Sequence, residues 1–139
     1  MIVVGITGAS GVIYGIRLLK ALNELNIENS LIISDAAKTV INHEVKEPIE
    51  DIITLADNYY EFDDLTASIN SGSFKFDGLA IVPCSMKTVA GIASGYSDNL
   101  LLRSSTTHSF ILFKFRVPYC SIRQMFHDDC KYTKLLPQT

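Results

Sequence analysis

Two short segments carry the small, hydroxyl-bearing and basic residues that could hold a phosphate group. Residues 5–11 read GITGASG, and residues 83–88 read PCSMKT. Glycine lets the backbone turn sharply and approach a ligand closely. A helix that begins at such a turn presents unpaired N–H groups and the positive end of its dipole to an anion. The hydroxyls of Ser85 and Thr88 and the ammonium group of Lys87 add donors. The two segments therefore predict an anion-binding site.

The glycine spacing of residues 5–11 leaves an alternative open. It matches neither G-x-G-x-x-G nor the Walker pattern with its lysine. Tight strand-to-helix turns without any ligand also occur throughout α/β folds. A plain turn therefore remains the competing interpretation of this segment taken alone, and the second segment of the same kind favours a site.

Other reactive side chains give weaker signals. Glu44 ends a predicted helix, where a carboxylate either moves protons for a nearby ligand or is a solvated surface group. Cys84 is expected to be a packed thiol rather than a nucleophile, because no histidine neighbours it in the sequence. Residues 127–130 (HDDC), with Cys120 upstream, lack a standard zinc spacing, so we expect no metal site.

The hydrophobic pattern places both glycine- and hydroxyl-rich segments at strand ends. Continuous apolar strands separated by helices indicate a parallel sheet covered on both faces. The carboxyl ends of parallel strands meet at one edge, where ligands bind in open α/β sheets. The predicted fold is thus α/β, a doubly wound parallel sheet. Strands are expected at 2–4, 31–33 and 78–82, and helices at 12–25, 35–44 with Asp35 as N-cap, 49–56, from about 89, and from 100.

Two stretches are less regular. Tyr59, Tyr60, Phe62 and Leu65 are expected to cover a sheet edge or an oligomer contact. After residue 103 the helical pattern fades, and residues 110–115 could form a fourth strand. A doubly wound domain needs a further helix and strand in this region, so the fold is expected to be incomplete at the C-terminus.

Composition narrows the class of protein. The chain has 139 residues, of which 47% are hydrophobic and 19% charged, as in an ordinary globular domain. A formal net charge of −3 gives no support to nucleic-acid binding. The sequence contains no apolar run of the roughly 18 residues that a membrane span needs. Three cysteines without C-x-x-C spacing suggest reduced thiols, so the expected location is cytoplasmic.

A nicotinamide-dependent reductase is one competing interpretation. Residues 7–11 (TGASG) resemble the turn of short-chain dehydrogenases, and Asp35 after the second strand could bind a ribose hydroxyl. That family pairs a catalytic tyrosine with a lysine four residues later, and this sequence contains no such pair. The reductase interpretation therefore lacks its chemistry.

A combination of motifs over residues 1 to about 103 resembles the UbiX-type flavin prenyltransferases, also described as aromatic acid decarboxylases. The matching segments, in family order, are residues 5–11, 14–19, 34–37, 67–69, 71–74, 83–88 and 95–100. The resemblance implies a flavoprotein, Rossmann-like three-layer αβα fold that binds FMN and forms a homo-oligomer, a dodecamer in the family. It implies transfer of a dimethylallyl group from dimethylallyl phosphate to reduced FMN at N5 and C6. The prenylated FMN would supply a UbiD-type decarboxylase, and no metal is required.

The same resemblance assigns roles to individual residues. Ser10 would lie near the reactive N5 edge of the flavin, Glu44 would assist proton movement, and Arg103 would face the substrate phosphate. The expected FMN-binding residues are Gly8, Ala9, Ser10, Ser34, Ser85, Met86, Lys87 and Thr88. A flavin-dependent cysteine decarboxylase is a weaker alternative, because the motif set is more similar to that of the prenyltransferases.

The resemblance stops where the family continues with an Arg-Ala-Ala-Asp segment. Here Arg103 is followed by Ser104-Ser105-Thr106-Thr107. The segments that supply the family's phosphate-binding Lys, Arg and Tyr have no counterpart in the residues that follow. We therefore divide the chain into an FMN-binding part, 1–103, and a divergent tail, 104–139. Our hypothesis is that the tail reflects truncation or a shifted reading frame. A catalytically impaired remnant that still binds FMN is accordingly an alternative function.

Overall fold

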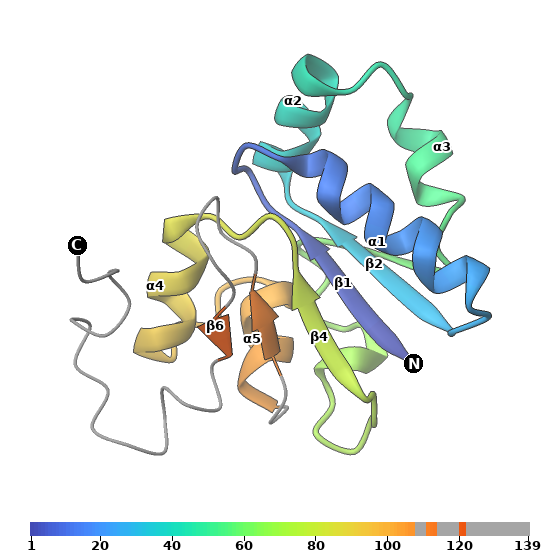
Figure 1. Cartoon of the computed structure of the whole chain (residues 1–139). Coiled ribbons are helices and arrows are strands. Elements are labelled where there is room, and N and C mark those ends of the chain that lie inside the picture. The colour runs from blue at the N-terminus through green and yellow to red at the C-terminus, as the bar shows by residue number, and fades with distance from the viewer. Residues whose placement is uncertain (108–110, 114–119, 122–139) are drawn as a thin grey trace.

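The computed structural model describes residues 1–107, 111–113 and 120–121 (Figure 1). Their strands form one six-stranded sheet in the order β3-β2-β1-β4-β5-β6. The strands β3, β2, β1, β4 and β5 pair in parallel, and β6 is antiparallel to β5. This confirms the predicted parallel sheet. The strands are β1 Ile2–Ile6, β2 Asn29–Ile33, β3 Asn58–Glu61, β4 Gly78–Ile81, β5 Ile111–Phe113 and β6 Cys120–Ser121.

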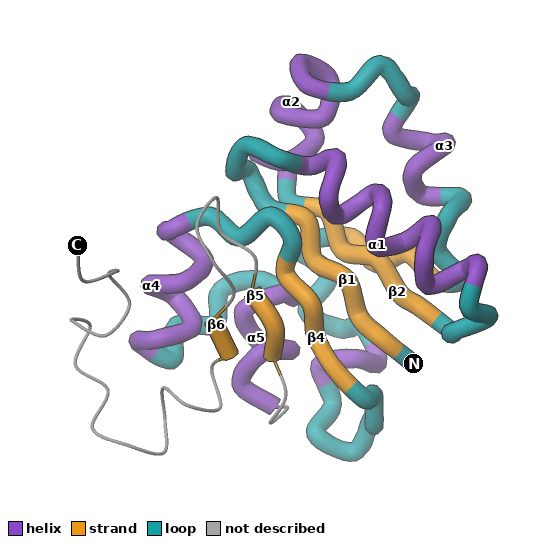
Figure 2. Tube along the Cα trace, viewed as in Figure 1, coloured by secondary structure: helices purple, strands orange, loops and turns teal. Residues whose placement is uncertain are grey.

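Helices cover both faces of the sheet and make three layers (Figures 1 and 2). Side chains of α1, α2 and α3 pack with one set of strand residues, and those of α4, α5 and the short helix η1 pack with another. The fold is therefore doubly wound, as predicted. The helices are α1 Val12–Glu24, α2 Asp35–Glu44, α3 Ile49–Ile53, η1 Ser68–Asn70, α4 Met86–Ser94 and α5 Leu100–Thr107.

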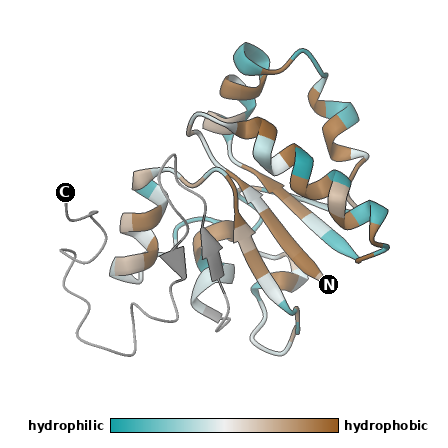
Figure 3. Ribbon diagram, in the orientation of Figure 1, coloured by the Kyte–Doolittle hydropathy of each residue, from teal (hydrophilic) through white to brown (hydrophobic). Residues whose placement is uncertain are grey.

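The central strand β1 contributes side chains to two hydrophobic clusters, one on each face of the sheet. Val4 and Ile6 belong to the cluster under α1, whereas Val3 belongs to the cluster under α5. Successive side chains of a strand point to opposite faces, so a continuous apolar run fits a sheet buried on both sides. The hydrophobic colouring of the central strands in Figure 3 follows from this pattern.

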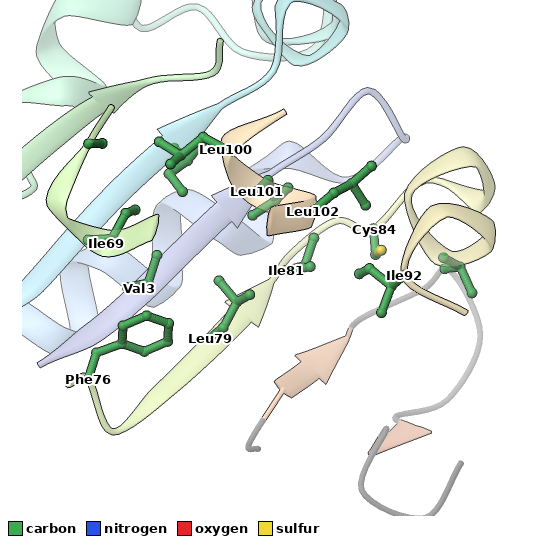
Figure 4. Packing of buried hydrophobic residues seen from close by; sticks show 13 residues of the cluster. Val3, Ile69, Phe76, Leu79, Ile81, Cys84, Ile92, Leu100, Leu101 and Leu102 are labelled. Carbon is green, nitrogen blue, oxygen red and sulfur yellow. The ribbon is translucent and has the colours of Figure 1, made fainter. Parts of the chain in front are cut away.

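Helix α1 buries a stripe of side chains with helical spacing. In α1 the buried side chains include Val12, Ile16, Leu19 and Leu22, three or four residues apart. Figure 4 shows the cluster under α5, in which Leu101 and Leu102 of α5 lie over Ile81 of β4. Full burial of one such side chain stabilises the fold by about 1.5–3 kcal/mol.

The order in which strands are added to the sheet reverses at β1, which lies between β2 and β4. From β1 the chain leads through α1 to β2 on one side, whereas β4 lies on the other side of β1 and leads into α4 on the opposite face. The loops that follow β1 and β4 therefore separate above neighbouring strands. In open α/β sheets this topological switch point is the position of the ligand crevice.

Two sequence predictions about helix ends were wrong. Ser34, not Asp35, is the N-cap of α2, because its extended backbone lets its hydroxyl accept a hydrogen bond from the backbone N–H of Ala37 at 3.2 Å. The helix predicted over 49–56 ends at Ile53. Beyond it the N–H groups of Leu55 and Ala56 donate to carbonyls only three residues back, which tightens the chain into a turn.

The aromatic segment holds a strand that was not predicted. Tyr59 and Tyr60 lie in β3, the edge strand next to β2, so this part is regular rather than irregular. Both tyrosines are half-buried, and Phe62 packs against the cluster under α5. Tyr59 and Tyr60 therefore form the edge of the sheet rather than covering it, and an oligomer contact through this group stays a prediction.

The division of the chain at residue 103 stays a prediction. The last described helix, α5, continues through Thr107, and Ser104 and Ser105 within it are buried. Strand β5 falls within the segment 110–115, of which residues 111–113 are described. Residues 127–130 lie outside the described residues. Within the described part, no helix has the length and apolar character to cross a membrane.

Candidate functional site

Three loops meet at the carboxyl edge of the sheet, held by the end of β1. The carbonyl oxygen of Ile6 accepts a hydrogen bond from the N–H of Ser34, which follows β2. On the other side, the N–H of Thr7 donates to the carbonyl oxygen of Pro83, which follows β4, at 3.2 Å. The loop after β1 therefore lies between the first residues of the helices α2 and α4.

The loop after β1 is shaped by two glycines. Gly11 has φ +98°, a left-handed conformation that residues with a side chain rarely adopt. At Gly8 an added Cβ would lie 2.4 Å from the Cβ of Ala36 in the first turn of α2. Gly8 is thus required for the close approach between this loop and α2. Ser10, between the two glycines, is exposed.

Glu44 reaches this loop from the last residue of α2. Its carboxylate oxygen Oε1 accepts a hydrogen bond from the Ser10 hydroxyl at 2.5 Å, and Oε2 accepts one from the N–H of Gly11 at 2.9 Å. A carboxylate at the beginning of α1 is also favoured by the helix dipole. The structure therefore brings together Ser10 and Glu44, the two residues for which the family resemblance predicts a catalytic role.

The loop after β4 leads into a capped helix. Ser85 is the N-cap of α4, and its hydroxyl accepts a hydrogen bond from the N–H of Thr88 at 3.3 Å and lies 2.9 Å from the Thr88 hydroxyl. This cap leaves the N–H groups of Met86 and Lys87, in the first helical turn, without an intrahelical acceptor. The side chains of Met86 and Lys87 are exposed.

The hydroxyls predicted for ligand binding also form hydrogen bonds within the fold. Ser34 is 7% exposed and caps α2, whose first N–H groups, from Asp35 and Ala36, have no intrahelical acceptor. Thr88 is 9% exposed and is held by Ser85. Any ligand at this edge therefore meets two capped helix starts, at α2 and α4, rather than a set of free hydroxyls.

Two basic side chains predicted for the site are available to an anion. Lys87 and Arg103 are both exposed, and neither forms an ion pair within the described part of the chain. Arg103 lies on the outer side of α5, next to the buried Leu102 and Ser104. Asp35, which the reductase interpretation needed for a ribose hydroxyl, pairs with Lys38 at 3.5 Å.

Cys84 is a packed thiol, as predicted. It is 3% exposed and belongs to the hydrophobic cluster under α5, where Figure 4 shows its sulfur near Leu102 and Ile92. Burial raises the pKa of Cys84 to about 12, because the thiolate loses its hydration. A thiol that stays protonated at neutral pH is a poor nucleophile.

The arrangement suits a phosphate-bearing ligand. Unpaired N–H groups at two helix starts, exposed Lys87 and a glycine loop without side-chain bulk all favour an anion and a close backbone approach. The described residues contain no group of three or more His, Cys, Asp or Glu side chains that could hold a metal ion.

Two residues that shape the site were missed by sequence reasoning. Thr7 is 2% exposed and its hydroxyl contacts both Pro83 and Ser85. Ala36 limits the space beside Gly8. The only signal for Thr7 was its place inside the glycine segment, directly after β1.

Comparison with known proteins gives concordant results. A family model described as Flavoprotein matches residues 1–119. A probable UbiX-like flavin prenyltransferase from Sedimentibacter hydroxybenzoicus is 50% identical over 105 residues, which are 75% of this chain and 56% of that protein. The chain thus spans about half the length of the curated relatives that it matches.

Two solved structures are similar in both fold and sequence. AnUbiX in complex with FMN and dimethylallyl pyrophosphate has a TM-score of 0.75 and 42% identity, covering 76% of this chain and 56% of that one. A dodecameric FMN-dependent UbiX-like decarboxylase from Escherichia coli O157:H7 has a TM-score of 0.81 and 40% identity, covering 84% of this chain and 66% of that one. With the family model matching most of its length, the chain belongs to the Flavoprotein family and within it resembles the UbiX-type flavin prenyltransferases.

Proposed function

We propose that the chain binds FMN at the carboxyl edge of its sheet and takes part in flavin prenylation, joining a dimethylallyl group from dimethylallyl phosphate to reduced FMN. The observation that carries the proposal is the Ser10–Glu44 hydrogen bond beside two capped helix starts, because it combines a proton-handling pair with an anion site. The similarity to AnUbiX, whose structure contains FMN and dimethylallyl pyrophosphate, supports the choice of ligands.

The residues present fit FMN. Gly8 has no room for a Cβ because Ala36 lies against it, so the loop of Gly8, Ala9 and Ser10 lies close to the start of α2, where the FMN would bind. Ser34 and residues 85–88 offer helix-start N–H groups, hydroxyls and one ammonium group for the ribityl and phosphate parts. Reduced FMN would supply the nucleophilic N5 and C6 atoms that receive the dimethylallyl group.

Ser10 and Glu44 would hold and move the proton. In the ionised state the Glu44 carboxylate accepts hydrogen bonds from the Ser10 hydroxyl and the Gly11 N–H, which fixes the hydroxyl in one orientation. A ligand atom beside Ser10 would exchange a proton with this hydroxyl while Glu44 takes up or returns the matching proton. Arg103 would attract the phosphate of the allyl substrate.

Further parts of the proposal concern partners. Prenylated FMN would pass to a UbiD-type decarboxylase, and the chain would assemble with copies of itself. The dodecameric state of the E. coli O157:H7 protein supports the second point.

The test is a prenylation assay on the purified full chain. The chain is loaded with FMN, reduced with dithionite without oxygen and mixed with dimethylallyl phosphate, and the flavin is examined by absorbance and mass spectrometry. A flavin carrying a dimethylallyl group supports the proposal. Bound but unmodified FMN limits the function to flavin binding and overturns prenyl transfer. Preference for a nicotinamide nucleotide over FMN overturns both parts.

A further inference from the structure

Where β1 and β4 end, the hydrogen bonds that link them change from backbone to side-chain contacts. The last bonds of the ladder are Val82 N–H to the Gly5 carbonyl, at 2.8 Å, and Thr7 N–H to the Pro83 carbonyl, at 3.2 Å. The next backbone donor after β4 that reaches the loop after β1 is the N–H of Ser85, and its acceptor there is a side chain.

That side chain is Thr7. Its hydroxyl donates to the Pro83 carbonyl at 2.8 Å and accepts from the Ser85 N–H at 2.7 Å. With Thr7 2% exposed, water has little access to replace either bond. The hydroxyl therefore takes over the hydrogen bonding at the point where the strands end and the two loops separate.

The hydrogen bond between Thr7 and Ser85 also fixes the first residues of α4. Ser85, whose N–H is held by Thr7, is also the N-cap whose hydroxyl receives the Thr88 N–H. The position of Ser85 decides where the unpaired N–H groups of Met86 and Lys87 lie relative to Gly8. Thr7 directly precedes Gly8, so one side chain sets the spacing between the two halves of the proposed FMN site.

We propose that Thr7 is a positioning residue that fixes the loop after β4 against the loop after β1, so that both contact one FMN molecule. The inference rests on the proposed function for its effect on FMN. Thr7 itself is buried and would not touch the ligand. Its loss would weaken binding because part of the binding energy would be spent on bringing the loops back together.

The first test compares two substitutions in the full chain. Thr7→Val keeps the shape and removes the hydroxyl, which leaves the Ser85 N–H without its acceptor; Thr7→Ser keeps the hydroxyl. FMN affinity, measured by quenching of flavin fluorescence, should fall at least about tenfold for T7V and stay within about threefold for T7S.

The control is Ser105→Ala, which deletes another buried hydroxyl. The Ser105 hydroxyl donates to the Leu102 carbonyl within α5, away from the loops. S105A should bind FMN as the wild type does; equal losses in T7V and S105A, or no loss in T7V, overturn the inference.

The second test needs neither FMN nor a variant. Site-resolved hydrogen exchange by NMR on the ligand-free chain should show the Ser85 amide at least about tenfold better protected than those of Met86 and Lys87, which begin the helix. Equal exchange at the three amides overturns the proposed positioning role of Thr7, even if T7V fails to fold. A wild-type chain that protects the Ser85 amide but binds no FMN overturns the proposed function and leaves the contact between the loops established.

Discussion

Ser10 and Glu44, 34 residues apart in the sequence, are joined by a hydrogen bond of 2.5 Å between the serine hydroxyl and a carboxylate oxygen. The second carboxylate oxygen accepts the N–H of Gly11, so both oxygens of Glu44 face the loop after β1. The last residue of α2 thereby holds the residues that begin α1. An exposed carboxylate with this geometry can orient a hydroxyl and exchange a proton with it.

Substitution of Glu44 by glutamine should slow prenyl transfer strongly while FMN binding persists. The amide keeps the shape of the side chain but cannot take up a proton, and general acid–base groups typically contribute about 10²–10⁴ in rate. Single-turnover formation of prenylated flavin should fall within that range in E44Q, with FMN affinity changed less than about tenfold. Glu47→Gln, which removes the exposed carboxylate that pairs with Lys20 at 3.1 Å, is the matched control. A full rate in E44Q would exclude proton transfer by Glu44.

Gly8→Ala should damage both the fold and the FMN site. The new Cβ would lie 2.4 Å from the Ala36 Cβ, so α2 or the loop after β1 must shift. Overpacking of this kind costs about 1–3 kcal/mol in the free energy of unfolding. Thermal unfolding and FMN titration would measure the two effects.

The contact itself can be tested by a compensating change. Removing the opposing methyl group in the double variant G8A/A36G should recover part of the lost FMN affinity. Gly72→Ala provides the control, because an added Cβ at Gly72 meets no atom within 4 Å. If A36G brings no recovery, the contact with Ala36 is not the reason for glycine at position 8.

The sequence allowed the sheet and the positions of the binding loops to be predicted, because both leave local signals. Continuous apolar runs such as Ile2–Ile6 indicate buried parallel strands, and the glycine and hydroxyl segments directly follow two of them. Strand β3 was missed, because its four residues are polar at both ends and form an edge strand with a neighbouring strand on one side only. Its sequence signal was the β propensity of two adjacent tyrosines.

Contacts between distant segments were beyond sequence reasoning. Nothing local shows that the Thr7 hydroxyl meets residues 76 and 78 positions later, or that Ala36 lies against Gly8. The choice between Ser34 and Asp35 as N-cap was also undetermined, since both residue types cap helices well. The three-dimensional path after β2 decides it, by giving Ser34 the extended backbone that a cap requires.

Ser34→Ala should therefore destabilise the chain more than Asp35→Ala. Loss of the Ser34 hydroxyl leaves the buried Ala37 N–H without its acceptor and should cost about 1 kcal/mol in the free energy of unfolding. Asp35 is exposed at the first helical position, where its carboxylate interacts with the helix dipole and with Lys38, worth a few tenths of a kcal/mol. Urea unfolding of both variants would measure the difference, and equal costs would argue against Ser34 as the cap.

The buried thiol of Cys84 should make the chain less stable in alkali. Burial raises its pKa from the ordinary value of 9.0 to about 12, so the folded state keeps the proton at pH values where the unfolded state releases it. Below about pH 8 both states are protonated and this group adds no pH dependence. Above pH 9 ionisation of the thiol favours the unfolded chain. The free energy of unfolding should therefore fall by about 1 kcal/mol between pH 8 and pH 10.

Urea unfolding of the wild type and Cys84→Ala at the two pH values isolates this contribution, because the other titrating groups are common to both proteins. The wild type should lose more stability than C84A on going to pH 10, and the native thiol should resist iodoacetamide at pH 8 until the chain is unfolded. A parallel pH dependence in the two proteins, with rapid native alkylation of Cys84, would show that the thiol ionises in the folded state.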